Sequence, residues 1–210
     1  MAPPLREKIK IIMIIGITGG IASGKTEVAK VFQKKGAVII SGDEIGKEVV
    51  EKNPALLKKL VQTFGKGILN SKGRLNRRKL GELAFASEKN KEKLNRIVHP
   101  YLLKELKHEI TKFRKARKKR EILVVDAALI VEWKLYKNLD KLILVTSPKE
   151  KRVQRLKSLK FSETETLNRI KRQLTDKQRK KYSDLVISNH GSLKGLKNKA
   201  LAVWKGIKSA

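Results

Sequence analysis

The segment Gly19–Thr26 reads GGIASGKT and fits the phosphate-binding pattern G-x-x-x-x-G-K-[ST] at every fixed position. Glycines in such a loop let the backbone turn so that successive N–H groups face inward and form a nest for an anion. A helix that starts at the end of the loop adds the partial positive charge of its N-terminus. We expect Lys25 to reach the β- and γ-phosphates and the Thr26 hydroxyl to bind Mg²⁺. The segment therefore predicts a site for ATP or GTP with Mg²⁺.

The segments on either side of this loop have the type that the pattern requires. A β-branched apolar run from Ile9 to Ile17 predicts a strand buried on both faces. From Lys25 the apolar residues take helical spacing until Gly36 ends the pattern. This context favours a phosphate-binding loop over a chance glycine-rich turn. The expected nucleotide-binding residues are Gly19, Gly20, Ile21, Ala22, Ser23, Gly24, Lys25, Thr26 and Glu27.

A carboxylate follows the second expected strand, residues 37–40. Asp43 lies in the sequence SGDEI directly after this strand, at the carboxyl edge of a parallel sheet, where open α/β sheets bind ligands. A carboxylate there could orient an acceptor hydroxyl and take its proton in a phosphoryl transfer. Aspartate is also a preferred helix N-cap. Position alone leaves the catalytic and the capping interpretations equally open.

The composition is strongly basic. The 210 residues include 51 Lys and Arg against 20 Asp and Glu, a formal net charge of +31, which implies polyanionic or phosphorylated ligands. Aromatic residues make up 5% of the chain, which disfavours base stacking on single strands. The absence of cysteine excludes disulfides and thiolate chemistry. The longest apolar run, residues 11–17, is too short to span a bilayer, and we expect a cytoplasmic protein without a membrane partner.

Strand-like and helix-like segments alternate along much of the chain. Apolar blocks at 122–125, 142–145 and 185–187 predict further strands, and amphipathic segments predict helices. The fold class expected from this alternation is α/β, a five-stranded parallel sheet flanked by helices.

Residues 53–118 contain several helical segments and no convincing strand, so we expect a helical insertion there. One helix is expected from Pro54, and another is expected to begin near Pro100. The basic cluster at 112–120 is interpreted as a solvated helix end, with a polyanion contact as the weaker alternative.

Two segments are similar to those of a known family. GITGGIASGK at residues 16–25 is very close to the P-loop of the dephospho-coenzyme A kinases, and SGDEI is similar to their Asp-Ala-Asp-x-Ile segment. The resemblance runs from about Met13 to Ser192. It matches Asp43 to the second, catalytic aspartate of that segment, whereas Ser41 stands in place of the first.

Motifs spread along the rest of the chain carry the same resemblance. They lie at residues 64–65, 73–77, 94–100, 126–132 and 183–189, and the fourth differs from the family at 128, 130 and 131. The resemblance implies acceptor binding by Asp43, Arg77, His99 and Leu129, although a structural role at a helix boundary is the stronger interpretation of His99. Asp126 ends a strand where it could reach Mg²⁺ through water, and a structural role is equally open.

Arg155 matches an arginine of the family's lid, which the resemblance implies over about residues 150–182. In the family a second arginine follows, whereas Leu159 and Lys160 stand near that place here. The lid arginine would meet the phosphates or Asp43 on closure. Because basic residues are abundant throughout the chain, an ordinary surface arginine is the alternative.

The resemblance implies transfer of the ATP γ-phosphoryl group to the ribose 3′-hydroxyl of dephospho-CoA, which gives CoA and ADP in the last step of CoA biosynthesis. In this reaction Asp43 would take the hydroxyl proton, Lys25 and the loop amides would hold the phosphates, and Thr26 would hold Mg²⁺. Arg155 would offset the charge on the transferred group. Residues 1–8 are expected to form a disordered basic leader and residues 9–210 a single P-loop kinase domain.

Two other functions remain open. A kinase for another nucleoside or nucleotide would share the loop and Asp43 but not the dispersed motifs. A nucleic-acid-binding ATPase would account for the charge directly. The expected partners are nevertheless the small molecules ATP and dephospho-CoA, with no nucleic acid.

Overall fold

The computed structural model describes residues 12–116, 121–158, 166–167, 170–171 and 173–209. The described chain forms two compact units. Residues up to Ile40 and from Ile110 onward form one, the sheet unit, and Ser41–Glu109 form the other, the helical unit. The leader expected over residues 1–8 lies outside the described residues.

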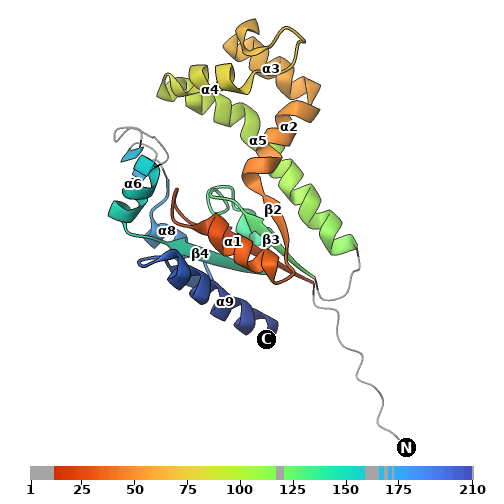
Figure 1. The fold of residues 1–210 in the computed structure, drawn as a ribbon. Coiled ribbons are helices and arrows are strands. Elements are labelled where there is room, and N and C mark those ends of the chain that lie inside the picture. Colours follow the sequence, from red (N-terminus) through yellow and green to blue (C-terminus); the bar gives the residue numbers. More distant parts are fainter. Residues whose placement is uncertain (1–11, 117–120, 159–165, 168–169, 172, 210) are drawn as a thin grey trace, which may run out of the picture. The chain divides into compact units, whose positions relative to one another are not determined.

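The sheet confirms the expected fold class (Figure 1). Its five strands have the order β2-β3-β1-β4-β5, and the pairs β1/β3, β1/β4 and β4/β5 are parallel. The strands are β1 (Met13–Thr18), β2 (Val38–Ser41), β3 (Ile122–Asp126), β4 (Lys141–Thr146) and β5 (Leu185–Ser188). β-Branched and leucine residues dominate them, because both faces of a parallel sheet are covered.

The central strand β1 lies between β3 and β4. The chain passes from β1 to one side of the sheet through β2 and β3, and later returns to the other side through β4 and β5. Such a switch of direction opens a crevice at the carboxyl end of the central strand. Ile17 is paired with Asp126 at this end, so the residues that follow β1 and β3 are neighbours.

One face of the sheet packs against α1 (Lys25–Lys34) and α9 (Leu193–Ser209). Alternate strand residues such as Ile15 and Ile17 are fully buried against these helices. Phe32 of α1 and Trp204 of α9 lie with ring centroids 5.1 Å apart. The helix that follows the phosphate-binding loop is therefore held by a core that includes the last described helix.

On the opposite face of the sheet, little room is left beside β1 at position 16, which is a glycine. A Cβ atom at Gly16 would lie 2.4 Å from Leu139 Cδ1, 2.9 Å from Leu142 Cδ1 and 3.1 Å from Ile130 Cδ1. The segment between β3 and β4, which includes the 3₁₀ turn η2 (Leu135–Asn138), thus packs directly on the central strand. The contacts of Ile130 and Leu139 with the central strand thus hold the turn that follows β3 against the sheet.

The helical unit consists of short helices around their own apolar core. Its elements are α2 (Gly42–Lys52), α3 (Pro54–Phe64), the 3₁₀ turn η1 (Lys66–Ile68), α4 (Arg77–Phe85) and the first part of α5 (Glu88–Lys115). Asn53 caps α3 through the amide of Leu56 at 2.9 Å, and Pro54 occupies the first turn as expected. The buried core includes Leu56, Leu60 and Ile68.

The prediction that a helix begins near Pro100 is wrong. α5 begins at Glu88 and continues through Pro100 to Lys115. A proline removes one backbone donor and disfavours helix in the preceding residue, but a long helix can continue through it when its other hydrogen bonds and packing compensate. Leu106 and Ile110 of α5 are buried, which shows the packing that favours continuation.

The expected lid region, 150–182, contains most of α6 (Lys149–Ser158) and all of α8 (Asp176–Lys180). A capping box between Thr175 and Gln178 fixes the start of α8. Most of the segment between these helices lies outside the described residues, so the lid stays a prediction.

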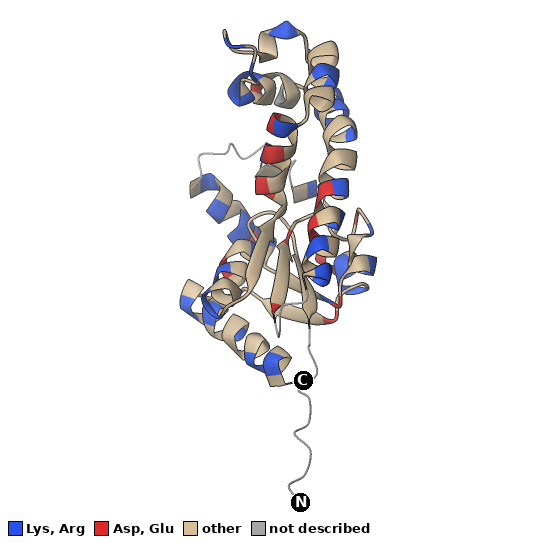
Figure 2. Cartoon of the chain, turned by 90° about the vertical axis from the view of Figure 1, so that its right-hand side faces the viewer, with Lys and Arg blue, Asp and Glu red and all other residues tan. Residues whose placement is uncertain are grey.

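Basic residues occur along helices of both units (Figure 2). α9 shows the excess most clearly, because it carries five lysines and no acidic residue. Its lysines are Lys194, Lys197, Lys199, Lys205 and Lys208. None of the helices in the described ranges is long and apolar enough to cross a membrane.

The contact between α1 and α9 gives a stability prediction. Trp204→Ala should lower the free energy of unfolding by about 3–5 kcal/mol, the usual cost of removing a buried aromatic side chain. Leu193→Ala, at an exposed position of the same helix, should change it by less than about 0.5 kcal/mol. Urea unfolding of both variants measures the difference, and equal small effects would contradict the observed packing of α9.

Candidate active site

The phosphate-binding loop connects β1 to α1 in the sheet unit. Gly24 is the N-cap of α1 with φ of +103°, and no side chain among the described residues caps the helix there. A Cβ atom at Gly24 would also lie 2.6 Å from Asn189 Nδ2. Both the backbone conformation and the close neighbour therefore favour glycine, and among the described residues no side chain competes with an anion at this helix N-terminus.

Lys25 and Glu27 follow at the start of α1. The Lys25 ammonium lies 3.4 Å from the carbonyl of Gly20, so it bends back over the loop. The Glu27 carboxylate pairs with Lys30 at 2.7 Å, one turn further along the helix. A cation held over inward-facing amides is the arrangement that binds the terminal phosphates of a nucleotide.

Thr26 and Asp126 form the part of the site that suits a metal ion. The Thr26 hydroxyl donates to Asp126 Oδ2 at 2.9 Å, and the Asp126 carboxylate is buried at the end of β3. No group of three or more His, Cys, Asp or Glu side chains that could hold a metal occurs in the described part of the chain. One hydroxyl and one carboxylate nevertheless fit Mg²⁺, which takes few protein ligands and completes its shell with phosphate oxygens and water.

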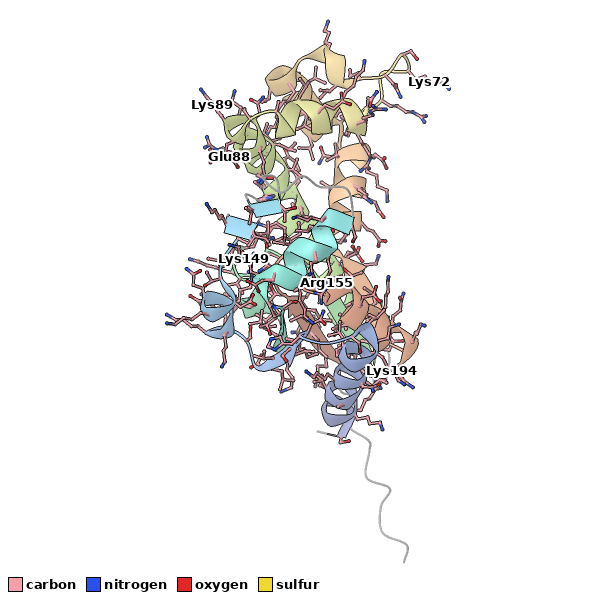
Figure 3. The ribbon with its side chains drawn as sticks, turned by 60° about the vertical axis from the view of Figure 1, so that its left-hand side comes forward. Lys72, Glu88, Lys89, Lys149, Arg155 and Lys194 are labelled. Carbon is pink, nitrogen blue, oxygen red and sulfur yellow. The ribbon has the colours of Figure 1, made fainter. Side chains whose placement is uncertain are left out.

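The outer side of the loop contacts the chain that follows β4 and β5. Arg155 of α6, labelled in Figure 3, donates from Nη1 to the carbonyl of Ala22 at 2.8 Å and to Ser147 Oγ at 3.1 Å. The Asn189 amide donates to the Ser23 carbonyl at 2.8 Å. Arg155 therefore lies on the outer side of the loop, and its contact with the phosphates stays a prediction.

Sequence reasoning assigned no contact with the loop to Arg152, Gln173 or Asn189, all of which contact the loop backbone. A signal for Arg152 was present, because residues three apart on a helix share a face and Arg155 was already assigned to the site. Asn189 ends the motif at residues 183–189, and Gln173 lies in the expected lid, but neither the motif nor the lid gave these two residues a role.

The turn after β3 is fixed by the end of β1. The buried Thr18 hydroxyl donates to the Ala128 carbonyl at 3.1 Å, which holds the backbone where the resembled family has proline. Leu129, a candidate acceptor contact, is half-buried in this turn, and its carbonyl accepts from Trp133. These two hydrogen bonds thus fix the backbone of the turn after β3, where a proline ring would otherwise do so.

An ion pair lies at the end of the segment that follows β3. Glu132 binds the fully buried Arg179 of α8 at 2.7 Å, and Arg179 also donates to the carbonyl of Leu174. Removing either partner would leave the other charge buried without its counterion. The pair ties the segment after β3 to α8, and the sequence analysis did not find it.

Asp43 lies in the helical unit, in the first turn of α2, where it is exposed. The N-cap of this helix is Ser41, whose Oγ accepts from the amide of Glu44 at 3.3 Å. The capping interpretation of Asp43 is therefore wrong. The serine precedes it and ends β2 in an extended conformation, which is the geometry that a cap requires. The S-x-x-E spacing from Ser41 to Glu44 was an available signal.

Arg77 and His99 also belong to the helical unit. Arg77 donates to the carbonyl of Lys47 at 2.7 Å and pairs with Glu51 at 2.7 Å, so it connects α4 to α2. His99 is half-buried inside α5, so its interpretation as a helix-boundary residue is wrong. Burial lowers the pKa of its imidazole below the ordinary value, which leaves the ring neutral at pH 7. Their acceptor-binding roles remain predictions, as does that of Leu129.

The sheet unit thus brings together the loop, Thr26, Asp126 and Arg155. The strand order and the loop between β1 and α1 define a P-loop kinase fold. A shikimate kinase from Acinetobacter baumannii superimposes with a TM-score of 0.55 at 15% identity, over 95% of each chain, which supports the fold class alone.

The particular family follows from the sequence comparisons. Residues 13–195 match the dephospho-CoA kinase family. A dephospho-CoA kinase from Bacillus licheniformis is 39% identical over 199 residues, which cover 93% of this chain and 98% of the relative. A crystal structure from Thermus thermophilus superimposes with a TM-score of 0.72 at 29% identity, over 94% of this chain and 99% of the other. The protein belongs to the dephospho-CoA kinase family.

The loop geometry predicts the effect of removing its lysine. Lys25→Ala should weaken ATP binding at least about tenfold, because a charge-assisted contact contributes roughly 1.5–3 kcal/mol. The melting temperature should stay near that of the wild type. Calorimetric titration with ATP measures the affinity, and Lys30→Ala, which removes an exposed lysine from the same helix, is the control. Unchanged ATP affinity in Lys25→Ala would contradict the assignment of the loop.

Proposed function

We propose that this protein transfers the γ-phosphoryl group of ATP to the ribose 3′-hydroxyl of dephospho-CoA and releases CoA and ADP. The acceptor oxygen forms a bond to the γ-phosphorus as the bond between that phosphorus and the β–γ bridging oxygen breaks. The hydroxyl proton passes to a carboxylate. The observation that carries the proposal is a phosphate-binding loop beside the Thr26–Asp126 pair in a chain of this family.

The nucleotide would be held by the loop and by Lys25. Inward-facing amides and the N-terminus of α1 place partial positive charge around the β-phosphate. The Lys25 ammonium, which lies over the Gly20 carbonyl, can move by a small rotation to a phosphate oxygen. This arrangement stabilises negative charge without a protein group that reacts covalently.

Mg²⁺ would be held by the Thr26 hydroxyl, with the Asp126 carboxylate as a direct ligand or as a partner of its water. When bound, the ion would neutralise negative charge on the nucleotide phosphates. The existing hydrogen bond of 2.9 Å between the two side chains keeps both oxygens on the same side of the loop. These residues thus prearrange the oxygens that the ion requires.

Asp43 would orient the acceptor hydroxyl and take its proton. Its carboxylate is exposed and has no capping role, because Ser41 caps α2. Arg155 would offset charge on the transferred group, and its position beside the Ala22 carbonyl keeps a fixed positive charge next to the loop. Arg77, His99 and Leu129 complete the proposal as acceptor contacts.

The proposal includes a cytoplasmic location, since ATP and dephospho-CoA are charged molecules that do not cross membranes unaided. It includes no nucleic-acid partner. The surplus of Lys and Arg would act by attracting anionic substrates from a distance.

An acceptor comparison tests the function directly. ADP release, measured in a coupled assay with ATP and Mg²⁺, should rise on addition of dephospho-CoA and should not rise with adenosine, uridine or duplex DNA. CoA should form in a one-to-one ratio with ADP. Stimulation by a nucleoside would indicate another small-molecule kinase, and stimulation by DNA would indicate a nucleic-acid-dependent ATPase.

Replacing the proposed base gives a sharper prediction. Asp43→Asn should lower kcat by roughly 10²- to 10⁴-fold, the range expected for loss of a general base, with little change in the KM for ATP. The melting temperature should not fall, because the cap of α2 is retained. Steady-state kinetics with dephospho-CoA and thermal unfolding measure both effects.

Two neighbours serve as controls for Asp43→Asn. Glu44→Gln removes an adjacent exposed carboxylate from the same turn and should retain activity. Ser41→Ala should reduce stability by about 1 kcal/mol through loss of the cap. Full activity in Asp43→Asn would exclude a catalytic role for Asp43, whereas a modest fall would favour orientation over proton removal, since a loose transition state needs little base assistance.

A further inference from the structure

Three consecutive carbonyls of the phosphate-binding loop each accept a hydrogen bond from a side chain far along the sequence. The pairs are Arg152 Nε to the Ile21 carbonyl at 2.9 Å, Arg155 Nη1 to the Ala22 carbonyl at 2.8 Å, and Asn189 Nδ2 to the Ser23 carbonyl at 2.8 Å. All six residues belong to the sheet unit.

These contacts decide the direction of the loop amides. In a trans peptide unit the carbonyl and the following N–H point in opposite directions. Donors on the outer side of the loop therefore turn the N–H groups of Ala22 and Gly24 toward the inner side, where a phosphate would bind. The N–H of Ser23 instead donates to the Gly20 carbonyl at 3.1 Å within the loop. Ala22 adopts φ of +58°. This conformation costs energy for a residue with a Cβ atom, and it persists only where the surrounding structure enforces it.

Ile21 is held on both sides. Its carbonyl accepts from Arg152 at 2.9 Å, and its N–H donates to Gln173 Oε1 at 2.7 Å. Arg152 Nη2 lies 3.5 Å from the same Gln173 oxygen. We call Arg152 and Gln173 the Ile21 clamp. Both backbone groups of this loop residue are satisfied by protein side chains, so the clamp fixes the orientation of two adjacent peptide units.

The clamp explains a glycine that the phosphate-binding pattern does not require. Gly20 stands at a variable position of the pattern, and its φ is not among the positive values. A Cβ atom there would lie 2.4 Å from Arg152 Nη2 and 2.5 Å from Arg152 Cζ. A Cβ atom at position 20 would therefore displace the guanidinium, and Gly20 allows Arg152 to pack directly on the loop.

Arg152 is buried, with 8% of its surface exposed. Burial lowers the pKa of its guanidinium below the ordinary value, while the Asp176 carboxylate opposes this shift and Arg179 adds to it. A buried cation is costly unless hydrogen bonds and a counterion compensate. The Arg152 guanidinium donates its compensating hydrogen bond to the loop. The burial of this charge therefore depends on the loop conformation, and the loop conformation depends on the buried guanidinium.

We propose that Arg152 and Gln173 are positioning residues that hold the phosphate-binding loop in the conformation that receives nucleotide phosphates. They act through the backbone of Ile21, and the amides of the loop make the contact with phosphate. The inference rests on the proposed use of this loop for ATP. It assigns no role in proton transfer or acceptor binding to either residue.

The experiment compares nucleotide affinities of variants that fold. Arg152→Met and Gln173→Leu remove the two halves of the clamp with little change in size. Each should weaken binding of both MgATP and MgADP by the same factor, roughly 10- to 100-fold for Arg152→Met, whose hydrogen bonds involve a charged group. kcat at saturating ATP should change much less than the KM for ATP, since a loss of uniform binding raises KM alone.

A double variant and a charge control complete the design. Because the two side chains share Ile21 and contact each other, Arg152→Met/Gln173→Leu should lose less affinity than the sum of the single losses predicts. Lys149→Met removes an exposed positive charge from the same helix (Figure 3) and should leave both affinities unchanged.

Three results would overturn the proposal. Loss of ATP affinity with ADP affinity intact would show a direct contact of Arg152 with the γ-phosphate. Unchanged affinities for both nucleotides with a lower melting temperature would show a purely structural role. Equal losses in Lys149→Met would show a general effect of charge. ATP binding by the wild type without turnover of dephospho-CoA would contradict the proposed function and leave this comparison valid, since the comparison needs only nucleotide affinity.

Discussion

A backbone that gives its N–H groups to a ligand must find partners for its carbonyls elsewhere, because buried peptide groups are costly when unpaired. In this protein the carbonyls of Ile21, Ala22 and Ser23 find donors on α6 and directly after β5. The strand order supplies them, since β4 lies next to β1 and β5 lies next to β4. The strand order of the sheet therefore places distant parts of the chain next to the outer side of the loop.

The sequence predicted the features that depend on close neighbours along the chain. The five strands, the loop between β1 and α1, and the start of α3 at Pro54 all follow from local patterns. The start of α5 did not, because the preference of proline for the first position of a helix was outweighed by the packing of a long helix. Of the residues that lie around the loop, the sequence named Lys25, Thr26, Asp126 and Arg155, whose roles stay predictions. It did not identify Arg152 or Gln173, which lie 131 and 152 positions from Ile21.

Asp43 shows how far a single position can be interpreted before the backbone is known. Serine and aspartate both cap helices, and the segment SGDEI offers both within three residues. The choice depends on where the extended backbone of β2 ends, which is at Ser41. Once the serine fills that position, the aspartate lies exposed in the first helical turn with no structural task among the described contacts. The structure thus removes the capping explanation of Asp43, which the sequence had left as open as the catalytic one.

The contact between Asn189 and the Ser23 carbonyl joins residues 166 positions apart. Ribosomal synthesis delivers the phosphate-binding loop well before Asn189, and nascent domains fold as their elements emerge. A partly synthesised chain therefore contains the whole motif but lacks a donor that orients it. The oriented form of the loop therefore arises only after β5 and Asn189 have been synthesised and have docked, 166 positions after the loop itself.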